Sequence, residues 1–479
     1  MQRTTDTGLA NSGQLGKAGV VFFAIAIGAM VGLLIAAASP LYVVAGLAGL
    51  GVATALVVNM QVGLLAFVTV ATLLPYAVIP LPIGGVRLTF IDAILTALLL
   101  MWLVRLLVRP GTKLESVSWG WLVVLFICLA ITSYTIGTGY STSPEATRLF
   151  LKLINSVLLF FTVLNCVRSK VQLQQIVAGL IFGGAVAAVI GIILFALPKG
   201  EATRWLMLLR PLGYYQSGGD ALRFIAGTET ERAIGTSVDP NVFGALLMLC
   251  LVLAVSQLLS SRPVISRNWL IPLSGLIFAC LLLTLSRGSW MGFIAAMFFI
   301  ATIKNRRLWF LFALGVGVFY FGLVPTDIPF VSHLLSGFAA RDQAAAMRLG
   351  EYKDAIQLIS RYPWFGVGFG SAPSADLYVG VSSVFLLIAE QMGLIGLAGF
   401  LATMSALFIS TLKRLEHIAD VELQGTLLGL LAALAAALFA GIFDHHYFDI
   451  RFPHVAALFW MLAGLLAVGL KLDEAREQS

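Results

Sequence analysis

Long apolar segments recur along almost the whole chain and restrict its fold more than any other feature. Most are close to the 20 residues with which an α-helix crosses a bilayer. Hydrophobic residues make up 59% of the 479 positions and charged residues only 11%, against about 25% charged in soluble domains. No alternation of apolar and polar residues indicates a membrane β-barrel. The sequence therefore predicts an all-α polytopic membrane protein.

About 14 transmembrane helices (12–14) are predicted within a single integral membrane domain, 1–479. They cover approximately residues 20–38, 41–58, 62–81, 90–108, 119–137, 151–167, 176–197, 242–260, 270–286, 289–303, 308–324, 382–411, 425–442 and 454–470. Between the first two, Ser39-Pro40 fits either a hairpin or a kink.

The distribution of Lys and Arg predicts the orientation. With the N-terminus inside, the inner loops and tails hold 16 of these residues and the short outer loops hold five, as the positive-inside rule requires. Both termini are then cytoplasmic, and two long polar segments, 198–241 and 325–381, lie on the extracytoplasmic side. Their aromatic content favours ordered loops with short helices over disordered linkers.

The net charge of +7 does not indicate nucleic acid. Cytoplasmic anchoring of helix ends accounts for much of it, and no basic tail, zinc-ligand spacing or stacking module is present. The expected partners include membrane lipids and exclude nucleic acid. All four cysteines fall in apolar segments, where they act as small packing residues and predict no disulfide framework.

The two long segments contain seven arginines, a residue type that is scarce on the outer face. They are Arg204, Arg210, Arg223, Arg232, Arg341, Arg348 and Arg361. Because guanidinium groups suit phosphate geometry, this enrichment indicates a site for an anionic group.

The end of the first polar segment leads directly into an apolar span. Asp239 and Pro240 are expected to start that helix as N-cap and first helical residue. Helix capping does not explain Arg232, seven residues before Asp239. A helix N-terminus that faces outward with an arginine beside it can bind an anion, so a capping role and an anion site both remain open here.

A second arginine, Arg287, lies in a very short turn between two apolar spans. Gly288 is expected to permit the tight turn, and Trp290 fits an interfacial belt. Arg287 could snorkel to the interface. Ionisable groups between spans more often face the interior or a cavity, which favours a functional role.

The second polar segment contains a predicted helix that should end near Arg361, because Pro363 restricts the residue before it. On this helix Leu349, Tyr352, Ile356 and Ile359 form a stripe that should pack against the bundle or lie in the interface. Arg341 and Arg348 share another face, although Glu351 offers Arg348 an ordinary ion pair. Residues 366–370 predict a tight turn with close backbone approach.

The last outer loop carries His445 and His446 between Asp444 and Asp449. Adjacent histidines near an aspartate could bind a metal, but without a third ligand at suitable spacing they indicate interfacial polar residues. Histidine titrates near neutral pH, so His445 and His446 are also candidate general bases.

Taken in order, these segments resemble the bacterial O-antigen ligase and O-antigen polymerase superfamily. The resemblance covers roughly residues 230–400. Its carriers are Arg232–Gly235, Asp239–Asn241, Leu285–Gly288, Arg348–Ile359, Arg361–Gly370 and Glu390–Gly396.

This resemblance implies a metal-independent glycosyltransferase at the outer face of the bacterial inner membrane, without a cofactor or nucleotide sugar. The implied donor is a glycan on undecaprenyl diphosphate, the acceptor a glycan or lipid, and an assembly or export complex a further partner. The family places arginines on the diphosphate and a loop histidine on the acceptor hydroxyl. By position, Arg232 and Arg287 bind the diphosphate, with Arg348 as the third arginine of the set.

The chain departs from the family pattern at Ser382, where ligases place the histidine. Serine cannot replace imidazole as a base near neutral pH. The candidates for that role are His333, Asp376, His445 and His446, and the departure favours a polymerase-like member. The alternatives are a lipid-linked oligosaccharide transporter, for which Glu390 is the principal deep acid, and a catalytically silent scaffold.

Overall fold

The computed structural model describes residues 59–79, 88–108, 114–137, 143–215, 221–225, 228–304, 309–310, 343–370 and 380–477. From Met60 onward these residues belong to one compact unit. The predicted spans 20–38 and 41–58, and nearly all of 308–324, lie outside the described residues.

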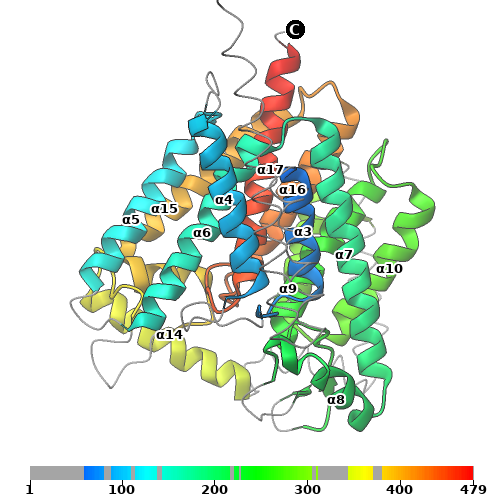
Figure 1. The fold of residues 1–479 in the computed structure, drawn as a ribbon, viewed down its shortest axis with the longest axis vertical. Coiled ribbons are helices and arrows are strands. Elements are labelled where there is room, and N and C mark those ends of the chain that lie inside the picture. Colours follow the sequence, from blue (N-terminus) through cyan, green and yellow to red (C-terminus); the bar gives the residue numbers. More distant parts are fainter. Residues whose placement is uncertain are drawn as a thin grey trace, which may run out of the picture. The chain divides into compact units, whose positions relative to one another are not determined.

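Every other predicted span corresponds to a helix in the structure (Figure 1). These helices are α3 (Met60–Leu73), α4 (Phe90–Val108), α5 (Gly120–Gly137), α6 (Pro144–Cys166), α7 (Lys170–Ala196), α9 (Pro240–Leu258), α10 (Arg267–Leu283), α11 (Arg287–Lys304), α15 (Val384–Leu415), α16 (Val421–Ala440) and α17 (Pro453–Glu477). Eight helices of the described part are long and apolar enough to cross a membrane. The all-α membrane class is confirmed, and the total of about 14 spans stays a prediction.

Helices α9, α16 and α17 form the centre of the bundle, since most of their residues are buried. Helix α17 packs mainly against α6 and α16, and α16 also packs against α9 and α11. Small residues of α16 permit this close approach: a Cβ on Gly425 would lie 2.4 Å from Ser260 Oγ, and one on Gly429 would lie 3.0 Å from Ser256 Oγ. The last residue of α16, Ala440, and the first residue of α17, Pro453, are both buried. The loop between α16 and α17 therefore starts and ends in the core.

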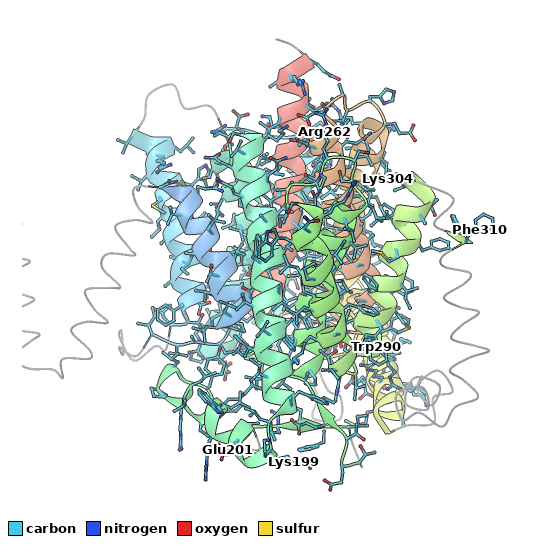
Figure 2. All side chains as sticks on the ribbon, turned by 90° about the vertical axis from the view of Figure 1, so that its right-hand side faces the viewer. Lys199, Glu201, Arg262, Trp290, Lys304 and Phe310 are labelled. Atoms are coloured by element: carbon cyan, nitrogen blue, oxygen red, sulfur yellow. The ribbon has the colours of Figure 1, made fainter. Side chains whose placement is uncertain are left out.

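One end of the bundle gathers paired charges. Lys170 Nζ lies 2.9 Å from Asp420 Oδ2, Arg414 pairs with Glu474 at 2.9 Å, and Lys471 pairs with Glu115. Figure 2 places Arg262 and Lys304 toward this end and Lys199 and Glu201 at the opposite end. The segments that the Lys and Arg count assigns to the cytoplasm thus lie together. Which end faces the cytoplasm stays a prediction.

The opposite end carries the described parts of the two long polar segments. The first contains α8 (Lys199–Met207), a 3-10 turn (Arg210–Leu212) and a short hairpin of β1 (Arg223–Phe224) and β2 (Glu231–Arg232). In the second, α14 (Gln343–Arg361) runs across the end of the bundle (Figure 1). The predicted short helices are present, whereas the hairpin was not predicted.

Helix α14 ends at Arg361 as predicted, but its packed face differs from the predicted stripe. Ala355 and Leu358 are buried, whereas Leu349 and Ile356 are 51% and 60% exposed. Tyr352 and Ile359 of the predicted stripe are partly buried, so the contact face is turned to one side of the stripe and is centred on Ala355 and Leu358.

A break in α15 joins two segments of the family resemblance. Gly393 has φ +68°, which interrupts the helix and leaves carbonyls without their usual helical partners. The backbone N–H of Val367 donates to Glu390 O at 2.9 Å, and that of Gly368 donates to Gln391 O at 3.0 Å. Gly137 lies so near that a Cβ on Gly368 would come within 2.6 Å of its Cα. The predicted close backbone approach is confirmed.

Candidate functional site

The loop between α16 and α17 carries the polar residues of the site in a fixed conformation. The N–H of Val384 donates to Gly441 O at 2.7 Å and to Asp444 O at 3.1 Å. The Tyr447 hydroxyl donates to Ala245 O at 3.4 Å. The loop is thereby tied to the start of α15 and to α9, and Asp444 has a defined position.

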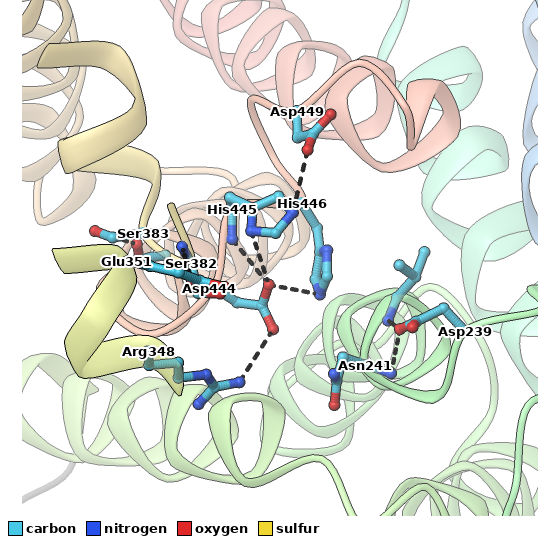
Figure 3. A network of polar contacts seen from close by, with 12 residues as sticks. Asp239, Asn241, Arg348, Glu351, Ser382, Ser383, Asp444, His445, His446 and Asp449 are labelled. Atoms are coloured by element: carbon cyan, nitrogen blue, oxygen red, sulfur yellow. Dashed lines mark hydrogen bonds and ion pairs between the residues drawn. The ribbon is translucent and has the colours of Figure 1, made fainter. Parts of the chain in front are cut away.

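Asp444 is the centre of a cluster of charges (Figure 3). Its Oδ1 lies 2.9 Å from His446 Nε2 and 3.7 Å from His445 Nδ1. The contact with His446 is short but does not have hydrogen-bond geometry, so it is an electrostatic contact. On the other side, Arg348 Nη2 lies 3.9 Å from Asp444 Oδ2.

These contacts shift the pKa values of Asp444 and His446. Burial opposes the charged form of Asp444, yet His446, His445 and Arg348 outweigh it and hold the pKa of this carboxyl well below its usual range. Burial likewise opposes protonation of His446, but the Asp444 carboxylate raises the pKa of this imidazole above its ordinary value. The two groups therefore form an ion pair at pH values below the raised pKa of His446.

His445 is held by a second carboxylate. Its Nε2 lies 3.1 Å from Asp449 Oδ2, and Arg451 Nη2 lies 2.5 Å from the same oxygen. Burial opposes ionisation of Asp449, but His445 and Arg451 keep the pKa of this carboxyl well below its usual range. Each histidine thus has a carboxylate beside it.

Arg232 reaches the cluster from the β1–β2 hairpin. Its Nε donates to Thr284 O at 2.9 Å, and its Nη2 donates to Asn241 Oδ1 at 2.6 Å. Asp239 caps α9 as predicted, accepting from the N–H groups of Asn241 and Val242. Among contacts between described residues, Arg232 pairs with neutral oxygens and with no carboxylate.

The turn that Arg232 binds leads directly to Arg287, the first residue of α11. Leu285 adopts φ +51° here, and Gly288 belongs to the first turn of α11, so the prediction that Gly288 makes the tight turn is wrong. The interfacial position predicted for Trp290 is also wrong. Its ring is buried, and Nε1 donates to Leu281 O at 2.9 Å, because an indole N–H inside the bundle needs an acceptor.

The three predicted arginines come together from three separate segments. The pKa of Arg232 is lowered to about 10, chiefly by burial; the positive charges of Arg287 and Arg348 act in the same direction, and the carboxylates of Asp239 and Asp444 oppose it. Arg287 and Arg348 are therefore close enough to repel Arg232. Such a cluster is stabilised when an anion binds between its members.

The remaining predicted residues fall into two groups. His333, Arg341 and Asp376 lie outside the described residues. Arg204, Arg210, Arg223 and Arg361 are exposed, and Arg204 pairs with Glu201 at 2.6 Å. These four arginines lie on the surface, unlike the partly buried Arg232 and Arg348.

Ser382 lies beside the cluster. Its N–H donates to Glu351 Oε2 at 3.0 Å, and its carbonyl accepts from the Tyr352 hydroxyl at 3.2 Å. Tyr352 also donates to Ile442 O at 3.2 Å. The position at which a histidine was expected is thus joined through α14 to the loop that carries His445 and His446.

Sequence reasoning missed Asp444 as the partner of Arg348 and of both histidines. His445 and Asp449 are four residues apart, a spacing that brings side chains together only in a helical turn. The apolar segments on either side of the loop do not predict such a turn. The sequence did identify Glu390 as an acid deep within a predicted span. It is buried, its Oε2 accepts from Gly380 N at 3.4 Å, and it adjoins the break in α15.

Asp444, His445 and His446 also form a possible metal-ligand group, since their ligand atoms lie within 4.8 Å of one another. Arg348 already contacts Asp444, and Arg232 adds a second nearby positive charge. A divalent cation would be repelled by both. The site suits an anion better than a metal.

The bundle and its arginine cluster define a multi-pass membrane protein of all-α class. Residues 272–401 match the family model of O-antigen ligase, which confirms the resemblance to the O-antigen ligase and polymerase superfamily. No curated protein matches the chain significantly. The matched range contains Arg287, Arg348 and Ser382. It starts after Arg232, so the predicted region 230–400 as a whole stays a prediction.

Proposed function

We propose that the chain transfers a glycan from undecaprenyl diphosphate to an acceptor hydroxyl at the outer face of the bacterial inner membrane. The observation that carries this proposal is the gathering of three arginines from separate segments. Arg232 Nη2 donates at 3.4 Å to Leu285 O in the turn before Arg287, and both Arg287 and Arg348 act electrostatically on Arg232. Two phosphates of one diphosphate group would neutralise the cluster. A lipid-bound donor also explains why the cluster lies at one end of a membrane bundle.

In the proposed reaction the acceptor oxygen attacks the anomeric carbon of the donor glycan. The bond between that carbon and the diphosphate oxygen breaks, and the electron pair leaves with the lipid diphosphate. Arg232 and Arg287 stabilise the charge that develops on this leaving group. Arg348 orients the same group from α14, and the acceptor proton passes to a base.

His446 is the proposed base, and Asp444 orients it and stabilises its protonated form, as in other carboxylate–histidine pairs. His445, held by Asp449, is the second candidate. The neighbouring loop would thus supply the imidazole that Ser382 lacks. His333 and Asp376 remain candidates from sequence alone.

The decisive experiment incubates the purified protein with undecaprenyl-diphosphate oligosaccharide and measures product size. A ladder of products identifies a polymerase, which Ser382 favours, and a single transfer to a second acceptor identifies a ligase. Activity should persist in a chelator, because the proposed chemistry needs no metal or cofactor. No product with any acceptor would contradict the proposal and favour a carrier or a scaffold of an assembly complex.

Arginine variants test the anion site in the same assay. Arg232→Ala and Arg287→Ala should each reduce the transfer rate by about 10²–10³, the usual effect of losing one such donor. Arg→Lys should restore activity only in part, because lysine keeps the charge without the bidentate fork.

Arg204→Ala is the matched control, since Arg204 is exposed and pairs with Glu201 on α8. It should retain the parental rate. Parental activity in both Arg232→Ala and Arg287→Ala would refute the anion site, and size-exclusion profiles establish that each variant is folded.

A further inference from the structure

An apolar groove lies along the bundle between α11, α15 and α16. It has a volume of about 790 Å³. Met291, Ala295, Phe299 and Ile303 line it from α11, with Leu412 of α15 and Phe439 of α16 opposite. The polar member of its lining, Thr302, donates its hydroxyl to Phe298 O at 2.9 Å. The groove is therefore suited to a hydrocarbon chain.

The groove continues the row of α11 on which Arg287 lies. Residues four apart lie on the same face of a helix, and Met291, Ala295, Phe299 and Ile303 follow Arg287 in steps of four. The arginine thus lies one turn before the first groove residue. A molecule whose charged end reaches Arg287 has its apolar part directed along this row.

The α16 wall of the groove also leads to the charged cluster. The rings of Phe439 and Phe443 lie 6.0 Å apart, and Asp444 follows Phe443. From α11, a Cβ on Gly288 would lie 4.0 Å from Phe443 Cβ. Both walls of the groove therefore end beside the proposed diphosphate site.

We propose that this groove binds the polyprenyl tail of the lipid-diphosphate donor. The inference rests on the proposed function. The stretch from Met291 to Ile303 is about 18 Å long at 1.5 Å per residue, more than half of the roughly 30 Å hydrocarbon core. It accommodates the part of the tail nearest the diphosphate.

Selection of this tail over other lipids comes from the charged end. Bulk lipid chains are as apolar as the groove, so apolar contact alone gives little preference. Once the diphosphate is bound, the attached tail meets the groove at a high effective concentration. The groove then fixes the donor through shape and dispersion contacts, and chain length becomes part of substrate specificity.

The test compares donors that carry the same glycan on an undecaprenyl chain or on a chain of two isoprene units. Ala295 of α11 and Ala435 of α16 line opposite walls of the groove. Ala295→Trp and Ala435→Trp therefore fill the groove from opposite sides. In each variant the ratio of kcat/KM for the long donor over the short donor should fall, because an indole ring in the groove removes the shape and dispersion contacts that fix the long tail.

Ala402→Trp is the control, because Ala402 is an exposed residue of α15 outside the groove. It should keep the parental ratio. An unchanged ratio in both groove variants, or a parental protein without preference for the long chain, overturns the tail site. Failure of the parental protein with both donors overturns the proposed function itself.

A photo-crosslinker identifies the occupant without relying on turnover. Benzoylphenylalanine in place of Ile294, an exposed lining residue of the groove, should attach to undecaprenyl diphosphate in a membrane, and excess unlabelled lipid diphosphate should compete. Attachment instead to residues 308–324 of the same chain, or to a second copy, overturns the proposal and names the occupant of the groove.

Discussion

Arg232 shows how a partly buried cation can be kept ready for a ligand. Its described contacts are neutral carbonyl and amide oxygens, which orient the guanidinium without neutralising it. A pKa of about 10 leaves the group protonated at neutral pH. Fixed donors of this kind need little reorganisation when charge develops on a leaving group.

Asp444→Asn should change the pH dependence of transfer. The carboxylate raises the pKa of His446, and only neutral imidazole accepts a proton, so parental activity should fall as the pH drops through this raised pKa. Without the carboxylate, burial dominates and lowers the pKa of His446. The acid limb of the kcat profile should move down by about 1–3 pH units, with a lower maximal rate.

Glu416→Gln is the control for this profile, because Glu416 is exposed at the C-terminal end of α15, far from the cluster. It should keep both the limb and the rate. An acid limb that stays in place in Asp444→Asn, or full activity in His446→Ala, would remove His446 from the role of base.

At the scale of single residues, the sequence predicted which residues belong to the site better than it predicted the contacts between them. Arg232 and Arg348 were identified from the arginine content of the long outer segments and Arg287 from its position between two spans, and in the structure Arg287 and Arg348 both act on Arg232. Asp444 could not be assigned to Arg348, because 96 residues separate them and no periodic pattern links α14 to the loop after α16. Gly288 and Trp290 were misassigned since backbone geometry and indole orientation depend on packing.

Among the elements, the break in α15 supports the site indirectly, because it binds the loop that follows α14. Loop residues Val367 and Gly368 bind the carbonyls of Glu390 and Gln391, and this loop follows α14, which carries Arg348. Apolar periodicity runs unbroken through Gly393, so a sequence predicts one continuous helix there. The break becomes predictable only when residues 366–370 are known to pack against it.

Gly366→Ala should destabilise the protein by about 1–3 kcal/mol. Gly366 has φ +67°, and a Cβ would lie 2.5 Å from the carbonyl carbon of Gln391, which is backbone and cannot move aside. Thermal unfolding in detergent measures the loss. Transfer activity should fall as well, because the loop fixes the end of α14.

The matched control is Gly350→Ala within α14, where no atom lies within 4 Å of the added Cβ. This change should leave stability unaltered or raise it by about 0.5–1 kcal/mol, since alanine favours a helix over glycine. Equal stability of both variants would mean that the loop does not depend on the left-handed conformation of Gly366.

Across the whole molecule, the length of the apolar segments predicted which helices form. Polar residues at the helix ends caused the errors in the predicted helix bounds. Helix α6 starts at Pro144, before the predicted 151, because Ser143 caps it and polar residues of its first turns fall outside an apolar window. The order of packing, with α9, α16 and α17 at the centre, could not be predicted. Apart from α6, with its polar residues such as Lys152 and Asn155, the spans are apolar on nearly every side, so hydropathy does not distinguish a face toward lipid from one toward protein.

The two ends of the bundle differ in a way that gives a prediction for the whole molecule. Ion pairs between acids and bases bind the loops of one end together, while the other end gathers the arginine cluster. If the positive-inside rule orients the protein, the arginine end faces away from the cytoplasm. The proposed reaction requires this orientation.

Single cysteines at the two ends test it. In spheroplasts a membrane-impermeant maleimide should label Gly200→Cys on α8 directly, because Gly200 is exposed with no atom near its added Cβ. Ser261→Cys, in the exposed turn between α9 and α10, should react only after permeabilisation. The parent chain, whose cysteines lie in α5, α6, α9 and α10, gives the background. The reverse pattern would put the arginine cluster in the cytoplasm, where a lipid-linked glycan on the outer face could not reach it.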